Sequence, residues 1–98
     1  MARFDVYAGH ETGLLLDIQA NVLGDLTTRI VVPLRVETSR PRPIARLNPI
    51  LLIEDKRYFM HTQLATAVGL RDLGPFVVNL GDQEWPITSA IDLLFFGI

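Results

Sequence analysis

The chain has 98 residues, of which 49% are hydrophobic and 20% charged, with a formal net charge of -2 and no cysteine. A chain of this length is expected to fold as one domain spanning residues 1–98. Its slightly acidic balance argues against direct nucleic-acid binding, and the lack of cysteine excludes disulfides and thiolate chemistry. No apolar run reaches the length of a membrane span, so we expect a cytoplasmic protein with no membrane partner.

The first half of the chain alternates strand patterns with short turns. Apolar and polar residues alternate over residues 3–7, and a second strand pattern covers residues 14–20 after a turn flanked by glycines, which predicts an N-terminal hairpin. Residues 22–26 form a loop that carries apolar side chains. Residues 27–34 are rich in β-branched side chains and predict a third strand, in which Pro33 favours a sheet edge or a bulge.

The second half begins with the most polar stretch, residues 37–46, whose prolines predict an exposed surface loop. Residues 50–53 and 58–60 flank a charged tip and predict a second hairpin. Residues 62–73 predict a short helix or a winding loop, because glycines weaken any long helix there. Residues 76–80 predict the last strand.

The C-terminal segment has a helical period. Pro86 is tolerated only in the first turn, so the helix is predicted to begin near residues 82–85. Rotation of about 100° per residue places Phe96 opposite the apolar stripe. Either the last turn unwinds at Gly97 and both phenylalanine rings fold back on the domain, or Phe96, Gly97 and Ile98 belong to a protein-binding surface. The stripe itself consists of Ile87, Ala90, Ile91, Leu94 and Ile98.

Five stretches together resemble the CcdB family of bacterial toxins that poison DNA gyrase. They are FDVY (residues 4–7), LDIQANVLG (16–24), RIVVPL (29–34), LNPILLIEDKRYFMHTQLATAV (47–68) and AIDLLFFGI (90–98). The resemblance implies a mainly β fold with one C-terminal α-helix, an SH3-like barrel built on an antiparallel sheet, as in CcdB-like and MazF-like toxins. It also implies a homodimer with its C-termini near the twofold axis, and a protein that is not an enzyme and has no catalytic residue, metal or cofactor.

The resemblance also implies partners and contact residues. In this family the C-terminal tip enters the A subunit of DNA gyrase and traps the cleaved-DNA complex, and a CcdA-like antitoxin releases the toxin. The family's well-known toxins have tryptophan at the position of Phe96 and asparagine at the position of Asp92. Carried over by position, the implied gyrase-contacting residues are Phe96, Gly97, Ile98, Val22, Leu23, Ser89 and Asp92.

Basic residues gather in and beside the polar loop. Arg35, Arg40, Arg42 and Arg46 predict either a solvated face or an electrostatic contact for an acidic antitoxin tail, to which we assign Arg40, Arg42 and Arg46. Trp85 is the only tryptophan and is predicted to cover the start of the helix, with a role at an interface as the alternative.

Two other functions stay open. His10 and His61 belong to no catalytic or metal-binding motif. The first alternative is a MazF-like endoribonuclease, in which Thr28, Arg29 and Arg57 would have to meet around a phosphate group. The second is a relative with the CcdB fold that no longer binds gyrase.

Overall fold

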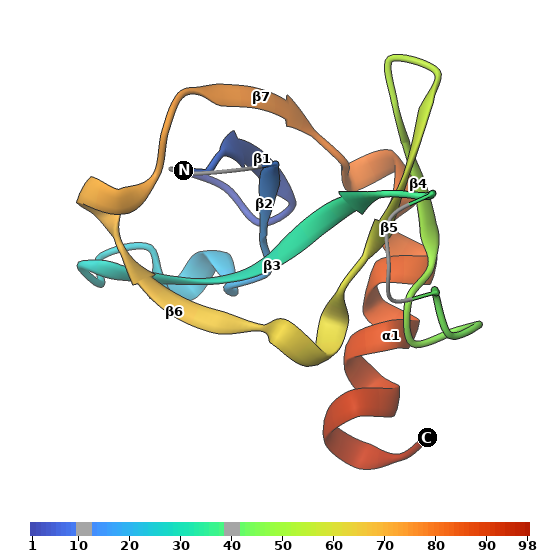
Figure 1. Ribbon diagram of the computed structural model, residues 1–98. Helices are drawn as coiled ribbons and strands as arrows, with labels where there is room; N and C mark the ends of the chain where they lie inside the picture. The colour runs from blue at the N-terminus through green and yellow to red at the C-terminus, as the bar shows by residue number, and fades with distance from the viewer. Residues whose placement is uncertain (10–12, 39–41) are drawn as a thin grey trace.

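The computed structural model describes residues 1–9, 13–38 and 42–98 (Figure 1). Seven strands lie in these parts of the chain: β1 (Asp5–Ala8), β2 (Leu14–Asp17), β3 (Thr28–Val36), β4 (Ile50–Ile53), β5 (Lys56–Met60), β6 (Thr66–Gly69) and β7 (Phe76–Asn79). They also contain the helix α1 (Glu84–Phe96) and four short 3-10 turns: η1 (Asn21–Leu23), η2 (Thr62–Leu64), η3 (Leu70–Asp72) and η4 (Gly81–Gln83). No helix in the described ranges is both long and apolar enough to cross a bilayer.

The strands form one antiparallel sheet in the order β4-β5-β3-β2-β1-β7, and β6 pairs with the first half of β3. Figure 1 shows the sheet curled into a half-barrel of SH3-like form, with α1 running beside β4 and β5 and extending past the sheet. The predicted fold class, an antiparallel SH3-like sheet with one C-terminal helix, is therefore confirmed.

Both predicted hairpins form. β1 pairs with β2, and β4 pairs with β5 across Glu54 and Asp55, which have φ values of 53° and 66°. Two consecutive residues with positive φ are typical of the type I′ turn, whose twist matches that of the flanking strands. β2 ends at Asp17 rather than residue 20, because the Asp17 carboxylate accepts a hydrogen bond from the backbone N–H of Gln19 at 3.0 Å and turns the chain.

The prediction that Pro33 marks a sheet edge or a bulge is wrong. Pro33 lies within β3, which pairs with β6 over residues 28–31 and with β5 over residues 34–36, along the same side. Pro33 falls between the two stretches. On that side no strand pairs with it, so the ladder does not need the N–H that proline lacks. Its carbonyl oxygen still accepts a hydrogen bond from the backbone N–H of His61 at 2.9 Å.

Residues 62–73 contain a strand that the sequence did not predict. The segment folds as η2, β6 and η3, and the register of β6 runs from Thr66 opposite Val31 to Gly69 opposite Thr28. A strand of four residues carries too little periodicity to be distinguished from a loop. The ladder with β3 therefore decides its conformation.

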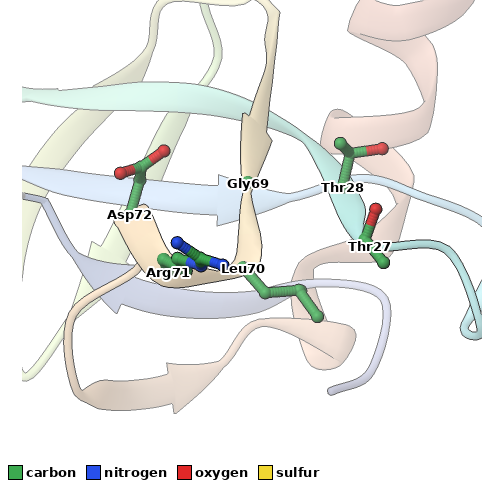
Figure 2. Close-up of a pocket in the computed structure, with 6 residues that line it drawn as sticks. All are labelled: Thr27, Thr28, Gly69, Leu70, Arg71 and Asp72. Atoms are coloured by element: carbon green, nitrogen blue, oxygen red, sulfur yellow. The ribbon is translucent and has the colours of Figure 1, made fainter.

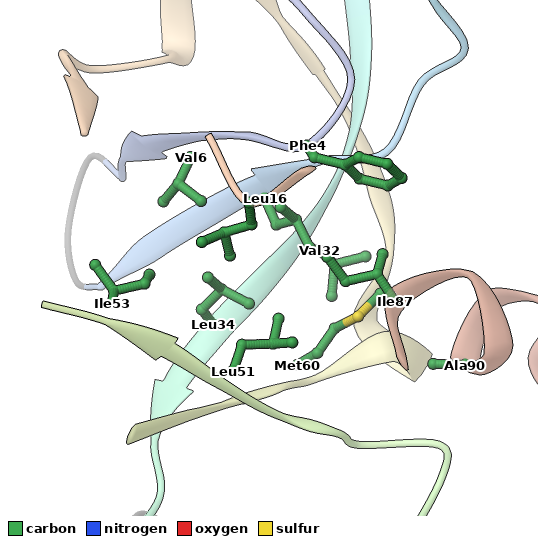
Figure 3. Close-up of a cluster of buried hydrophobic side chains, with 11 residues drawn as sticks. Phe4, Val6, Leu16, Val32, Leu34, Leu51, Ile53, Met60, Ile87 and Ala90 are labelled. Atoms are coloured by element: carbon green, nitrogen blue, oxygen red, sulfur yellow. The ribbon is translucent and has the colours of Figure 1, made fainter. Parts of the chain in front are cut away.

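The core lies between the concave face of the sheet and the first half of α1. Figure 3 shows Ile87 beside Val32 and Met60, with Ala90 next along the helix. This contact buries the apolar face at the start of α1, which attaches the helix to the barrel. The buried cluster consists of Phe4, Val6, Leu16, Val32, Leu34, Leu51, Ile53, Met60, Leu80, Ile87 and Ala90.

The side chain of Gln83 binds the backbone of the edge strand β4. Its Oε1 accepts a hydrogen bond from the N–H of Leu52 at 2.9 Å, and its Nε2 donates to the carbonyl of Leu52 at 2.8 Å. β4 is the last strand of the sheet, so the outward peptide groups of Leu52 have no strand partner on that side. The amide satisfies both groups and connects the start of α1 to the edge of the sheet.

Candidate functional site

Helix α1 changes from buried to exposed along its length. Ile87 and Ala90 have no exposed surface, Ile91 is half-buried, Leu94 is 37% exposed and Ile98 is 76% exposed. The predicted apolar stripe is thus buried only over its first half, because the last turns of α1 extend past the sheet (Figure 1). The end of the helix keeps apolar side chains that this protomer does not cover.

The two phenylalanine rings at the helix end point to solvent. Phe95 is 61% exposed and Phe96 is 71% exposed, so the predicted outward position of Phe96 is confirmed and the alternative, in which both rings fold back, is wrong. Gly97 has a φ of 69° and donates its N–H to the carbonyl of Leu93 at 3.0 Å, a left-handed helix cap. The exposed apolar surface also includes Leu94 and Phe95, which the sequence pattern does not assign to the site.

We name Phe95, Phe96, Gly97 and Ile98 the tip. A side chain built at Gly97 would meet no atom within 4 Å, so the space beside its backbone is open. Apolar rings next to an uncovered peptide group suit a flat, close contact with another protein.

Val22 and Leu23 form a separate apolar patch. They lie in η1, where Val22 is 88% exposed and Leu23 is 47% exposed. In Figure 1 this turn lies at the left of the view, near β3, whereas the C-terminal end of α1 lies at the lower right. Within one protomer the structure therefore does not bring the patch and the tip together.

The two polar contact residues predicted on the helix are Ser89 and Asp92. Both lie on α1 and are half-buried. The Ser89 hydroxyl accepts a hydrogen bond from Nε of Arg46 at 2.7 Å. Of the three arginines predicted to meet an antitoxin, Arg42 and Arg46 are exposed, and Arg40 lies outside the described residues. Arg46 thus connects the polar loop with the helix that carries the tip.

Trp85 does not cover the start of the helix, so that prediction is wrong. It lies in the first turn of α1 and is 85% exposed. It borders a hollow of about 210 Å³ together with Arg3, Glu84 and Thr88. The alternative, a role at an interface, stays a prediction.

A larger hollow of about 720 Å³ lies where β6 meets the start of β3. Figure 2 shows the two threonines on one side of it and the turn η3 on the other. Its one cation, Arg71, is next in sequence to the carboxylate of Asp72, so the lining has no net charge with which to select an anion. No group of three or more metal-ligand side chains gathers in the described ranges. The residues lining the hollow are Thr27, Thr28, Gly69, Leu70, Arg71 and Asp72.

A fully buried ion pair lies inside the barrel. Nε of Arg29 donates to Oδ2 of Asp17 at 2.7 Å, and Nη2 lies 2.7 Å from the same oxygen. The two side chains are 1% and 0% exposed. Asp17 neutralises this guanidinium in the interior, and because its side chain is buried, Arg29 is closed to a substrate.

The three residues of the endoribonuclease alternative do not meet. Thr28 and Arg29 lie at the start of β3, whereas Arg57 lies beside Glu37, just past the end of that strand. Nε of Arg57 donates to Oε1 of Glu37 at 2.9 Å, so its charge is already paired. The arrangement forms no common phosphate site.

A second buried polar group surrounds Asp5. Its carboxylate accepts hydrogen bonds from the Tyr7 hydroxyl at 3.0 Å and from Nδ2 of Asn79 at 2.8 Å. Burial, followed by the hydrogen bond to Asp5, raises the pKa of Tyr7 to about 12. Tyr7 therefore keeps its proton at neutral pH and serves as a structural donor.

His61 gives the fold a measurable pH dependence. It is 5% exposed, and its Nδ1 accepts a hydrogen bond from Nε of Arg35 at 3.0 Å. Burial, and then the positive charge of Arg35, lower the pKa of His61 from 6.5. The unfolded chain therefore binds more protons as the pH falls through that value, and folding stability decreases toward acid.

We expect the urea midpoint to fall between about pH 7 and pH 5.5, where a histidine with an ordinary pKa titrates and carboxylates stay ionised. His61→Asn should remove most of this slope, whatever it does to the midpoint at pH 7. Equal slopes for the two proteins, measured by circular dichroism, would contradict the assignment to His61.

Comparison with known proteins gives two consistent results. Three solved structures share the fold. An endoribonuclease in complex with its cognate antitoxin from a mycobacterial species matches with a TM-score of 0.76 and 14% identity, over 94% of this chain and 91% of that one. A mycobacterial endoribonuclease matches with a TM-score of 0.77 and 15% identity, over 94% and 88% of the two chains, and the Mycobacterium tuberculosis toxin MazF-mt6 with a TM-score of 0.67 and 20% identity, over 93% and 95%. Because the sequence identities are so low, these three matches show that the fold is shared and no more. The family model described as CcdB protein matches residues 3–97, nearly the whole chain. The chain therefore belongs to the CcdB family.

Proposed function

We propose that this chain is the toxin of a type II toxin–antitoxin pair and that it binds the A subunit of DNA gyrase through the tip. The observation that carries the proposal is the exposed end of α1, where Phe96 and Ile98 are 71% and 76% exposed. The chain belongs to the CcdB family, and the resemblance to the toxins of that family implies a gyrase contact at this position. Binding there would hold the cleaved-DNA complex in place and would require no catalysis by this chain.

The chemistry of the tip suits such a contact. The face of the Phe96 ring can receive an arginine of the partner, although a phenylalanine face is weaker than the tryptophan of the family's well-known toxins. The open backbone at Gly97 admits a close approach. The carboxylate of Asp92 favours a basic group where an asparagine would offer an amide. Val22 and Leu23 supply a second apolar contact in this proposal.

The assembly that we propose is a cytoplasmic homodimer neutralised by a CcdA-like antitoxin. The chain's structural neighbours include an endoribonuclease described in complex with its cognate antitoxin, which supports an antitoxin partner for this chain. An acidic antitoxin segment would be attracted to Arg42 and Arg46, and to Arg40 in the same loop. The dimer would present two copies of the tip to gyrase.

Calorimetry with the gyrase A subunit of the host bacterium tests the proposal directly. We expect one binding event per dimer, followed by accumulation of cleaved DNA when gyrase, DNA and ATP are added. A folded protein that fails to bind the subunit would show that the fold is kept and the target is not gyrase.

An endoribonuclease is the alternative that the structural neighbours favour, since all three are described as endoribonucleases or as a MazF toxin. The separation of Arg29 from Arg57 and their pairing with carboxylates weigh against it. Incubation of the purified protein with total RNA is expected to leave the RNA intact. Cleavage at defined sites would replace the gyrase proposal with this one.

A further inference from the structure

The guanidinium of Arg46 bridges the body of α1 and the tip. Its Nε donates to Oγ of Ser89 at 2.7 Å, and its Nη2 donates to the backbone oxygen of Ile98 at 2.6 Å. The two acceptors are separated by the last turns of the helix and the left-handed cap at Gly97. One side chain from the polar loop therefore fixes the position of Ile98 relative to the helix.

The loop that carries Arg46 is attached to the barrel on its other side. Asn48 is 3% exposed, and its Oδ1 accepts from the N–H of Ile44 at 2.9 Å while its Nδ2 donates to the carbonyl of Met60 at 2.9 Å. The hydroxyl of Thr62 donates to the carbonyl of Leu47. Buried and half-buried hydrogen bonds thus hold the chain on both sides of Arg46.

The backbone of Arg46 is also specialised. Its φ is 56°, in the left-handed region, which an arginine adopts only at some cost in free energy. This conformation directs the side chain toward the C-terminal end of α1. There a cation meets the negative end of the helix dipole, which adds a favourable interaction to the two hydrogen bonds.

We propose that Arg46 is a positioning residue that holds the tip in one conformation, so that Phe96 and Ile98 are presented to a partner already ordered. The part of the inference that concerns affinity rests on the proposed function, because gyrase is the partner considered. Without Arg46, Ile98 would lose its contact with the polar loop and Gly97 would keep only its bond to Leu93, so binding would include the cost of ordering the end of the chain. This role lies within the protomer and differs from the antitoxin contact predicted for the same residue.

Four variants separate this role from general effects of charge and backbone strain. Arg46→Asn removes the guanidinium, and asparagine tolerates positive φ, so the loop should keep its shape. Arg42→Asn makes the same change of charge at another exposed position of the loop and serves as the matched control. Ser89→Ala removes one acceptor, and Arg46→Lys keeps the charge but lacks the planar fork that reaches two acceptors.

The first measurement is the ¹⁵N–¹H heteronuclear NOE of the free protein, which needs no gyrase. In Arg46→Asn, the values at Gly97 and Ile98 should fall, while those at Ile87 and Ala90 stay unchanged. Arg42→Asn should match the wild type, and Arg46→Lys and Ser89→Ala should be intermediate. An equally ordered Ile98 in Arg46→Asn would overturn the inference, as would an Arg46→Lys protein identical to the wild type.

The second measurement is the affinity for the gyrase A subunit by calorimetry. Loss of a charge-assisted contact at an exposed site should weaken binding about five- to tenfold in Arg46→Asn and less than about twofold in Arg42→Asn. If the wild type does not bind gyrase, the proposed function fails and the NOE comparison still decides the role of Arg46. A third outcome is that the tip is ordered in the wild type and mobile in Arg46→Asn, while the two proteins bind gyrase with equal affinity. Arg46 would then order the tip without affecting recognition, and the part of the inference that concerns affinity would be overturned.

Discussion

Removal of Phe96, Gly97 and Ile98 is expected to abolish binding to the gyrase A subunit and to leave the barrel folded. Phe96 and Ile98 are mostly exposed, so they contribute little to the core, and the free energy of unfolding should change by no more than about 1 kcal/mol. The single change Phe96→Ala should weaken binding about 30-fold, the effect of losing one aromatic hot spot of about 2 kcal/mol. Calorimetry measures the affinity, and urea unfolding measures the stability.

Trp85 provides a matched control for this experiment. It is also a strongly exposed aromatic residue of α1, at 85%, but it lies at the opposite end of the helix from the tip. Trp85→Ala should change the affinity by less than about twofold, because a contact at the tip does not reach it. Equal losses in Trp85→Ala and Phe96→Ala would mean that recognition extends along the whole helix, and a truncated protein that still bound gyrase would contradict the assignment to the tip.

Asp17→Asn is expected to be the most destabilising of the charge changes considered for this fold. The substitution leaves the guanidinium of Arg29 buried, 1% exposed, without its carboxylate partner. Removing one member of a buried pair costs about 3–5 kcal/mol, because the remaining charge stays desolvated. The free energy of unfolding, measured in urea by circular dichroism, should fall by that amount.

The exposed pair between Arg57 and Glu37 is the comparison. Its side chains are 56% and 38% exposed, and solvent screens their interaction. Glu37→Gln should therefore cost less than about 1 kcal/mol. The double change Asp17→Leu with Arg29→Met should recover much of the stability lost in Asp17→Asn, since neither charge then stays buried. If Asp17→Asn and Glu37→Gln lowered the free energy of unfolding by similar amounts, burial of the ion pair would not determine the cost of breaking it.

Local patterns predict most of this fold. The strands at residues 50–53 and 76–80 and the start of the helix near residues 82–85 follow from alternation, turn residues and the position of Pro86, and all are found within a few residues. β6 could not be predicted in this way, because its four residues adopt a strand through pairing with β3. A proline in a strand pattern predicts an edge or a bulge, because the sequence does not show that the neighbour of β3 changes at Pro33.

The candidate site was predicted in part. Helical rotation places Phe96 away from the core, as the structure confirms, but the same period also predicts burial of Leu94 and Ile98. Whether Leu94 and Ile98 are buried depends on how far the sheet extends beside the helix, and no local sequence pattern encodes this. The contact of Arg46 with Ser89 and Ile98 joins residues more than forty positions apart and depends on the fold as a whole.

The bonds between Gln83 and Leu52 bear on how the protein avoids unwanted assembly. An edge strand with free peptide groups accepts strands from other chains, which leads to aggregation. In β4 the amide of Gln83 occupies both outward groups of Leu52, so a strand approaching this edge cannot pair with the chain at that residue. The molecule can therefore carry exposed apolar side chains at the end of α1 while this part of its sheet edge is closed to strands of other chains.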